Sequence, residues 1–337
     1  MSHQLIRSLL FKFDAEFSHD LTLKALSLSN KIGLLSFLKP PNPCKLRTVM
    51  GIPFKNPVGL AAGLDKNANH IDALGKLGFG FIEVGTITPR PQLGNPKPRL
   101  FRLPEVQGII NRFGFNNVGL EAAVENIRLS NYKGVLGINI GKNFDTPLER
   151  AGEDYLLCMK KVYQYANYIA VNISSPNTKN LRDLQESKAL NILLAQLKDE
   201  QTRLADYYGR YVPIALKISP DLTNKHLDAI SKSIIKYRID GVIATNTTIS
   251  RELVNDLFNG KEAGGMSGKP LFKLSNLIIR ELHARLQGEV PIIGVGGIFS
   301  GEDALEKINA GAELIQIYSG LVYQGRKLVL DACQSIG

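Results

Sequence analysis

The chain has little of the sulfur and imidazole chemistry that marks disulfide-bonded or metal-binding proteins. Its 337 residues include three cysteines, and no two of them form a C-x-x-C pair. An odd number of widely spaced cysteines predicts reduced thiols without a disulfide framework, as in an intracellular protein. The five histidines form no H-x-x-x-H pair, so no metal site is predicted. The cysteines are Cys44, Cys158 and Cys333.

Long apolar stretches are also missing. No segment approaches the roughly 18 consecutive apolar residues that a transmembrane helix needs. Arg7, Lys12 and Asp14 interrupt the N-terminus too early for the apolar region of a signal peptide. We therefore expect a protein that stays in the cytoplasm and lies peripherally on the cytoplasmic face of the cell membrane.

Basic charge does not accumulate locally, although the net charge is +10 and the pI is about 9.4. No basic run is longer than two residues, as at Lys160-Lys161, and tryptophan is absent. Nucleic-acid binding is therefore disfavoured, because such surfaces gather basic and aromatic side chains. An anionic membrane surface and anionic small molecules remain as partners that would explain the charge.

Beyond residue 40, short apolar runs alternate with stretches of helical periodicity. Most of the runs are apolar throughout, which is typical of parallel strands buried on both faces. Helical stretches include Leu190–Leu204, Leu227–Ile235 and Ala304–Ala310. This alternation predicts an α/β fold, a (β/α)₈ TIM barrel over residues 41–337. A doubly wound sheet is the alternative, but no G-x-G-x-x-G turn follows the first strand. The eight predicted strands are Val58–Ala62, Phe81–Gly85, Val135–Ile140, Tyr168–Ile173, Pro213–Ile218, Gly241–Thr245, Pro291–Val295 and Leu314–Tyr318.

Residues 1–40 form a small N-terminal extension that contains almost no glycine. Leu5, Leu9, Phe13 and Phe17 recur every four residues, which predicts an amphipathic helix. A second helix is predicted where large apolar residues lie among lysines, and the prolines after it end the helical run. Two interpretations stay open: a helical hairpin that caps the barrel floor, or a foot that lies on a membrane. The second helix is inferred from Leu23, Leu26, Ile32, Leu35 and Leu38 among Lys24, Lys31 and Lys39, followed by Pro40, Pro41 and Pro43.

Asparagines gather at the carboxyl ends of the predicted strands, where the active site of such a barrel lies. A carboxamide offers both a donor and an acceptor, so several of them suit a ring in which C=O and N–H groups alternate, such as an imide-like pyrimidine. A single asparagine is more often a turn residue, but five together favour a binding pocket. They are Asn111, Asn139, Asn172, Asn177 and Asn246.

Two lysines, Lys66 and Lys217, follow or end predicted strands. Lysine is uncommon at the end of a buried strand unless an anion lies beside it. The pair could meet a carboxylate and a reduced, anionic flavin. Alternatively, each side chain reaches solvent at the barrel rim.

Glycines after the last two strands, followed by the capping-box spacing Ser300 to Asp303, predict a phosphate cradle at a helix N-terminus. The loop Gly264–Gly268 could approach the same ligand. The base is harder to identify, because no His, Asp or Glu stands out at a strand end. Ser175 lies in the stiff turn Ser-Ser-Pro-Asn, which is also compatible with an ordinary turn.

At four segments the chain resembles the class 2 dihydroorotate dehydrogenase family, the membrane-associated bacterial and mitochondrial type. These segments are 56–63 (NPVGLAAG), 111–117 (NRFGFNN), 172–178 (NISSPNT) and 294–298 (GVGGI). The resemblance covers nearly the whole chain and includes the N-terminal helices. It implies a barrel that oxidises dihydroorotate to orotate on bound FMN, in de novo pyrimidine (UMP) biosynthesis, with a membrane quinone as the electron acceptor.

The resemblance also implies roles for particular residues. Ser175 would be the catalytic base, in the place where class 1 enzymes carry a cysteine. The substrate would be held by Lys66, Asn111, Gly114, Phe115, Asn172, Asn177, Asn246 and Thr247. FMN would be held by Ala62, Gly63, Lys66, Thr86, Asn139, Asn172, Lys217, Thr245, Gly268, Gly297, Tyr318 and Ser319. His19 and Arg102, with Tyr318, would line the quinone entrance.

Three other functional interpretations compete with that of a class 2 dihydroorotate dehydrogenase. A dihydrouridine synthase would need an RNA-binding domain, and none is visible. A class 1 enzyme that uses fumarate or NAD would carry a cysteine at position 175. A peripheral membrane protein that keeps the barrel only as a scaffold would not need the set of Lys66, Asn172, Ser175 and Lys217. We expect a monomer whose residues 1–40 touch the membrane.

Overall fold

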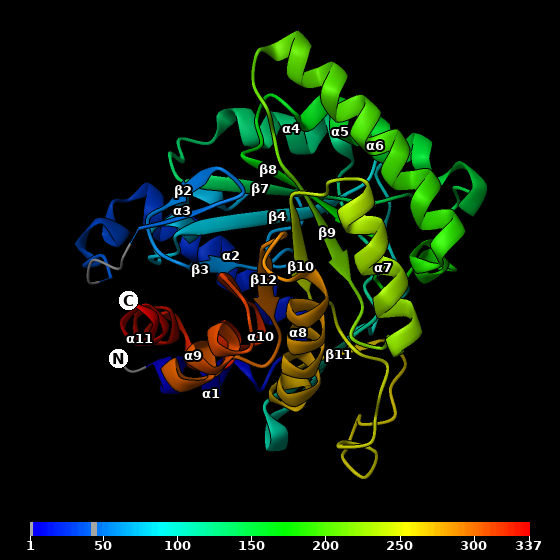
Figure 1. Ribbon diagram of the computed structural model, residues 1–337. Coiled ribbons are helices and arrows are strands. Elements are labelled where there is room, and N and C mark those ends of the chain that lie inside the picture. Colours follow the sequence, from blue (N-terminus) through cyan, green and yellow to red (C-terminus); the bar gives the residue numbers. More distant parts are fainter. Residues whose placement is uncertain (1–2, 42–45) are drawn as a thin grey trace.

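Eight parallel strands close into a barrel, as predicted. The structure is a computed structural model that describes residues 3–41 and 46–337. Each strand pairs with the next one along the chain, and the last pairs with the first (Figure 1). A doubly wound sheet is thereby excluded. The strands are β3 (Val58–Leu60), β4 (Phe81–Ile87), β7 (Val135–Ile140), β8 (Tyr168–Asn172), β9 (Ile214–Ile218), β10 (Gly241–Ala244), β12 (Ile292–Val295) and β13 (Leu314–Ile317).

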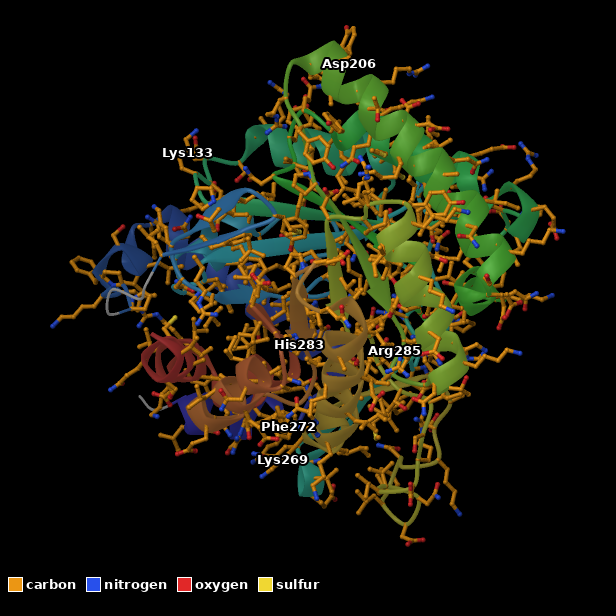
Figure 2. The ribbon with its side chains drawn as sticks, in the orientation of Figure 1. Lys133, Asp206, Lys269, Phe272, His283 and Arg285 are labelled. Atoms are coloured by element: carbon orange, nitrogen blue, oxygen red, sulfur yellow. The ribbon has the colours of Figure 1, made fainter. Side chains whose placement is uncertain are left out.

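Helices cover the outside of the barrel, and neighbours along the chain pack side by side. The three predicted helical stretches fall on α6, α7 and α9. Figure 2 labels Arg285, through which α8 donates a 2.7 Å hydrogen bond to Asp228 of α7. The helices are α3 (Ile71–Gly75), α4 (Leu120–Leu129), α5 (Ala151–Val162), α6 (Ser187–Tyr208), α7 (Asn224–Lys236), α8 (Phe272–Leu286), α9 (Gly301–Asn309), α10 (Ser319–Gln324) and α11 (Arg326–Ile336).

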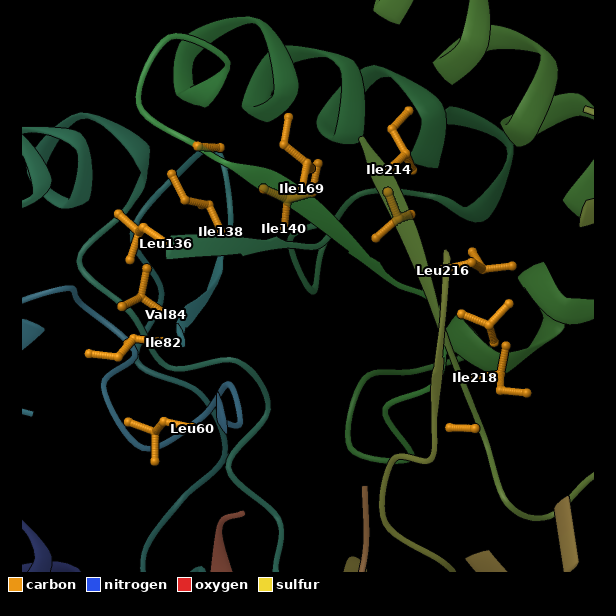
Figure 3. Close-up of a cluster of buried hydrophobic side chains, with 14 of the residues drawn as sticks. Leu60, Ile82, Val84, Leu136, Ile138, Ile140, Ile169, Ile214, Leu216 and Ile218 are labelled. Carbon is orange, nitrogen blue, oxygen red and sulfur yellow. The ribbon is translucent and has the colours of Figure 1, made fainter. Parts of the chain in front are cut away.

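The strands bury both faces, and alternate residues serve two different cores. Side chains such as Leu60, Ile82 and Ile138 point outward and pack beneath the helices (Figure 3). The inward set begins with large apolar residues, among them Phe81 and Tyr168, at the amino ends of the strands. Polar residues take the inward positions further along, so the barrel interior becomes hydrophilic toward the carboxyl ends.

A short hairpin closes the floor of the barrel. It consists of β1 (Arg47–Val49) and β2 (Ile52–Phe54), which pair in antiparallel fashion. Phe54 is fully buried, and its ring lies 5.1 Å from that of Phe81 at the amino end of β4. The interpretation of residues 1–40 as a cap on the floor is therefore wrong. Pro43, one of the prolines predicted to end the helical run, lies outside the described residues, and so does Cys44.

The N-terminal helices lie at the opposite, carboxyl end of the strands. They are α1 (His3–Leu10) and α2 (Ala15–Lys31), followed by the 3₁₀ turn η1 (Leu34–Phe37). One continuous helix through Phe17 was expected, but the chain turns after Leu10. Asp14 then caps α2 by accepting a 2.9 Å hydrogen bond from the Phe17 amide, because a short acidic side chain satisfies the free N–H groups of a first turn.

A small antiparallel sheet stands beside the barrel mouth, and the sequence patterns did not predict it. It contains β5 (Leu100–Leu103), β6 (Gly108–Asn111) and β11 (Gly265–Gly268), in the order β11-β6-β5. The helix α2 packs on β5 and on α3, and α1 packs on α10. Within the described ranges, no helix combines the length and the apolar character required to cross a bilayer.

Candidate active site

A cavity opens at the carboxyl ends of the barrel strands, with about 990 Å³ of empty space that includes the part open to solvent. Cofactor and substrate pockets occupy this end of TIM barrels. Most of the residues that the sequence analysis singled out line the cavity, although their strands are far apart in the chain. They are Ala62, Gly63, Lys66, Thr86, Asn111, Gly114, Phe115, Asn172, Ser175, Asn177, Lys217, Thr245, Asn246, Thr247, Gly268, Gly297, Tyr318 and Ser319.

Lys66 reaches the cavity from the loop that follows β3. Its ammonium group lies 3.9 Å from the centre of the Phe113 ring, a cation–π contact. Burial lowers the pKa of Lys66 to about 8, although Glu16 opposes the shift. The loop is held by Asp65, whose carboxylate accepts hydrogen bonds from the amides of Asn69 and His70. A desolvated cation beside an apolar ring is suited to bind an anionic ligand.

Lys217 enters the same cavity from the end of β9 and is only 5% exposed. Its ammonium nitrogen lies 4.0 Å from Oε1 of Glu83, a fully buried residue of β4. Burial lowers the pKa of Lys217, and the Glu83 carboxylate opposes that shift. The alternative that Lys217 simply reaches solvent at the rim is therefore excluded.

The asparagines form a connected array. Asn172 donates to Thr86 Oγ1 at 3.1 Å and to Asn139 Oδ1 at 3.3 Å, and it accepts from Asn246 Nδ2 at 3.3 Å. Asn177 donates to both oxygens of Asn111, at 3.1 and 3.2 Å. Asn139 itself lies below the cavity rather than in its lining. The array fixes which amide faces of the lining present donors and which present acceptors.

Ser175 is 6% exposed and lies in the turn after β8. Its Oγ accepts a 3.2 Å hydrogen bond from the Asn177 amide. The described lining residues include no Asp, Glu or His, in agreement with the expectation that no conventional base stands at a strand end. The turn is anchored by Arg182, which donates to the carbonyl of Ser174 at 3.0 Å and forms an ion pair with Asp221 at 2.7 Å.

Glycine backbone forms one wall of the cavity. Gly297 has φ +75°, and a Cβ there would lie 2.5 Å from Phe272, so only glycine fits. The helix start at Ser300 is capped as predicted, since Ser300 Oγ accepts from the Asp303 amide at 3.0 Å. However, this helix end does not line the cavity. The Asp303 carboxylate already accepts a 2.7 Å hydrogen bond from the Phe299 amide there. Of the predicted phosphate cradle, the glycines after the last two barrel strands do line the cavity, namely Gly296, Gly297 and Gly320.

His19 and Arg102 lie at the junction of the N-terminal helices with the barrel and do not line the cavity. His19, on α2, has its pKa lowered to about 3 by burial and by the nearby Lys66. Arg102, on β5, donates to the Phe13 carbonyl at 2.9 Å and stacks over Phe11 at 4.5 Å. Both residues therefore join the extension to the mouth of the barrel.

The whole chain has close relatives. A sequence model of the family described as dihydroorotate dehydrogenase matches residues 46–337. The chain is 61% identical over 337 residues to a dihydroorotate dehydrogenase (quinone) of Methylobacillus flagellatus, with 100% of both chains covered. The chain belongs to the dihydroorotate dehydrogenase family. A protein of the same description from Dechloromonas aromatica is 57% identical over 340 residues, which cover 100% of this chain and 98% of that protein.

Solved structures of the family share the fold. The crystal structure of DHODH from Eimeria tenella in complex with ferulenol gives a TM-score of 0.88 at 36% identity, covering 97% of this chain and 93% of that one. The ligand-free structure gives 0.86 at 37% identity, covering 94% and 93%. Relatives of the quinone-dependent class agree with the class 2 resemblance of the sequence. Because the chain belongs to this family, it is a flavin-dependent oxidoreductase. The two alternatives of a non-catalytic scaffold and a dihydrouridine synthase are thereby excluded.

Within this dihydroorotate dehydrogenase barrel, the sequence analysis missed two inward-facing polar residues. Gln316 on β13 lines the cavity and Glu83 on β4 lies beneath it, and both sit inside runs that are otherwise apolar. Their position in the runs was a usable signal, since both fall on the inward-facing alternation. Phe113 and Ser267 also line the cavity; they lie in segments that the sequence analysis named, 111–117 and Gly264–Gly268, but no role was given to these two side chains. No cluster of metal ligands occurs in the described part of the chain, and Cys158 is a buried thiol.

Proposed function

We propose that this chain oxidises dihydroorotate to orotate with bound FMN and passes the electrons to a membrane quinone, in de novo pyrimidine biosynthesis. One observation carries the proposal: two desolvated cations, Lys66 and Lys217, face one cavity whose remaining polar lining is neutral amide and hydroxyl. Such a lining suits an uncharged, imide-like ring with a carboxylate at one edge, together with a flavin.

The deep part of the cavity fits FMN. Thr245 Oγ1 and Gln316 Oε1 are buried there without hydrogen-bond partners, although buried polar atoms are normally satisfied. Lys217, Thr86 and Tyr318 lie around the same space. These residues, with the other predicted cofactor ligands, would hold the isoalloxazine ring, and the glycine wall would approach the ribityl phosphate. When bound, FMN supplies the hydride-accepting chemistry that side chains lack.

Dihydroorotate would lie on the mouth side of the cavity. The Lys66 ammonium would bind its carboxylate, because no carboxylate forms an ion pair with this lysine among the described residues. Asn111, Asn172, Asn177 and Asn246 would bind the imide edge through paired donors and acceptors. Gly114, Phe115 and Thr247 would complete the contact.

Ser175 would take the proton from C5 of the substrate. Its Oγ is held as an acceptor by the Asn177 amide, which leaves its own O–H free to be directed toward a proton acceptor. Serine is a weak base, so the turn must exclude bulk water and hold the hydroxyl in line. Arg182 helps by tying the Ser174 carbonyl to the Thr247 carbonyl, with 3.0 and 2.9 Å bonds.

The experiment is direct. Purified protein should carry a yellow flavin that bleaches anaerobically when dihydroorotate is added and recovers when a short-chain quinone follows. Release by acid and chromatography against authentic FMN and FAD identifies the flavin. A colourless protein, or a flavin that dihydroorotate does not bleach, would remove the proposal. Bleaching reversed by fumarate or NAD but not by quinone would instead indicate a class 1 reaction.

We further propose that residues 1–40 form the quinone entrance and a peripheral membrane contact, and that residues 41–337 form the catalytic domain. Large apolar side chains are exposed on both sides of the α1–α2 turn and beyond α2. The exposed set is Leu5, Ile6, Leu9, Phe13, Phe17, Leu21, Leu28, Ile32, Leu34 and Phe37. Basic residues lie among them, as in helices that lie in a membrane interface. His19, Arg102 and Tyr318 would line the path from this surface to the flavin.

A variant that removes only exposed side chains tests this without disturbing the packing. Leu28, Ile32 and Phe37 are 61%, 68% and 86% exposed. Changing all three to serine should weaken binding to anionic vesicles and slow long-chain quinone reduction, while flavin reduction by dihydroorotate is kept. Serine at Leu253 and Phe258, exposed by 64% and 84%, is the matched control. Unchanged vesicle binding in the triple variant would contradict the membrane role. We expect a monomer on the cytoplasmic face of the membrane.

A further inference from the structure

Glu83 is a fully buried carboxylate in the middle of β4, pointing into the barrel below the cavity. Three donors from three other strands meet it. Asn139 Nδ2 lies 2.8 Å from Oε1, while the Tyr168 hydroxyl and Gln316 Nε2 lie 2.8 and 2.6 Å from Oε2. Lys217, from a fourth strand, lies 4.0 Å away. No role assigned so far uses this carboxylate.

A buried charge is costly, and an apolar residue of similar volume often stabilises a fold equally well. The barrel nevertheless makes room for this network. A Cβ at Gly137 would lie 2.2 Å from the Tyr168 ring, so glycine there lets the tyrosine reach Glu83. Burial and the Glu83 charge both raise the pKa of Tyr168, which therefore stays a hydrogen-bond donor. The arrangement is built around an acceptor at this position.

The carboxylate imposes a direction on the amides above it. Because it only accepts, Asn139 must turn its NH₂ group downward, which leaves Asn139 Oδ1 to accept from Thr86 Oγ1 at 2.6 Å and from Asn172 Nδ2 at 3.3 Å. Asn172 Oδ1 then accepts from Asn246 Nδ2 at 3.3 Å. The donor-to-acceptor order thus runs from Asn246 in the cavity wall down to Glu83.

Gln316 is oriented in the same way. Its Nε2 is committed to Glu83, so its Oε1 is left as a buried acceptor without a partner in a residue that lines the cavity. One carboxylate therefore determines the donor or acceptor character of two separate walls. The same carboxylate places a negative charge beneath the ammonium of Lys217. This negative charge offsets the positive charge of Lys217 at the cavity.

We propose that Glu83 is a positioning residue that sets the hydrogen-bond polarity of Asn139, Asn172 and Asn246 and offsets the charge of Lys217, so that it governs both pyrimidine recognition and the reduction potential of the flavin. This inference rests on the proposed function. It concerns a residue that touches neither substrate nor cofactor and acts through its neighbours.

The test compares Glu83→Gln with the parent in two measurements that need no turnover. The potential of bound FMN should rise, because Lys217 then acts without a counter-charge and favours the more negative reduced flavin. A tenfold change in the ratio of affinities for reduced and oxidised FMN corresponds to about 30 mV. Orotate affinity, read from the flavin absorbance, should fall about tenfold, because glutamine can also donate and no longer fixes the orientation of Asn139.

Two further variants separate the roles. Tyr168→Phe removes one donor but keeps the charge and the amide order, so its potential and orotate affinity should stay within about twofold of the parent. Asn139→Leu breaks the amide chain and keeps Glu83 beside Lys217. It should weaken orotate binding, and it still tests the amide order if Glu83→Gln fails to fold.

The outcomes are distinct. A folded Glu83→Gln variant with the potential and orotate affinity of the parent overturns the inference. Unchanged orotate binding in Asn139→Leu overturns the polarity role, and a large potential shift in Tyr168→Phe overturns the assignment to charge. A parent protein that takes up no FMN refutes the proposed function and this inference with it. If the parent protein is yellow and Glu83→Gln has the same flavin potential and orotate affinity, the inference about Glu83 is refuted while the proposed function stands.

Discussion

Replacing Ser175 with alanine is the most direct test of the proposed chemistry. The substitution removes one hydroxyl from a turn whose backbone is held independently by Arg182. FMN and substrate binding should therefore survive. The rate of flavin reduction by dihydroorotate should fall, because the proton on C5 then has no positioned acceptor.

The structure indicates the size of the loss. A positioned base commonly contributes about 10²–10⁴-fold, which is roughly 3–5 kcal/mol of barrier at about 1.4 kcal/mol per factor of ten. Ser175 is 6% exposed and no Asp, Glu or His belongs to the described lining, so no carboxylate or imidazole there replaces it. We expect a loss near the upper end of this range.

Anaerobic stopped-flow measurement of the flavin absorbance provides the assay, since it isolates the reductive half-reaction. Ser174→Ala is a matched control: it removes a neighbouring buried hydroxyl that bonds Asn172 and Asn246, so it should change affinity more than rate. Lys66, with a pKa of about 8, is the competing base in the cavity. Flavin reduction by Ser175→Ala at near the parent rate would refute Ser175 as the base.

Three further predictions concern buried lysines. Lys217→Met should lower the potential of bound FMN in spectroelectrochemical titration, because the cation that favours the reduced flavin is gone; an unchanged potential with fast reduction would contradict its electrostatic role. Orotate affinity should be constant below about pH 8 and fall as the pH rises through the Lys66 pKa, since only the ammonium form attracts the carboxylate; Lys66→Met should bind weakly at every pH, and a retained pH step in that variant would exclude Lys66 as its source. Lys307 is fully buried, and its pKa is lowered by burial from 10.5 to about 7. Between about pH 7 and pH 10.5, Lys307 binds a proton more often in the unfolded state than in the folded state. The free energy of unfolding should therefore rise with pH in this range, by up to about 1.4 kcal/mol per pH unit. Denaturant titrations from pH 7 to 10 should show this rise in the parent and a smaller one in Lys307→Met.

The barrel was predictable because parallel buried strands leave a clear signal. Each of the eight predicted strands overlaps an observed strand, and Val135–Ile140 matches β7 at both ends. The small sheet beside the mouth was missed because β6 and β11 are short and glycine-rich, with no sustained alternation. The break between α1 and α2 was missed because the four-residue spacing from Leu5 to Phe17 continues across the turn, while the cap at Asp14 was not weighed.

The cavity lining was largely predictable because strand ends converge in a barrel, so residues distant in sequence had to meet. The spacing of residues in the sequence could not predict the layer of polar side chains beneath the cavity. Glu83 and Gln316 look like isolated polar residues in apolar runs, and only the closed barrel brings them within 2.6 Å of each other. Of the predicted phosphate cradle, the glycines line the cavity and the Ser300 helix end does not, because the sequence does not reveal which of two neighbouring turns faces inward.

The floor hairpin makes the barrel a dead end rather than a passage. Among the described residues, Phe54 and Phe81 pack ring against ring and apolar side chains fill the amino end of the barrel below the cavity. Orotate would therefore leave through the mouth, past the turn that carries Ser175 and Asn177. On the proposed mechanism, the segment that would shut out water during proton removal would also set the rate of product release, and opening of this segment, rather than bond breaking, would limit the steady state. Turnover should then slow as solvent viscosity increases, while single-turnover flavin reduction stays the same.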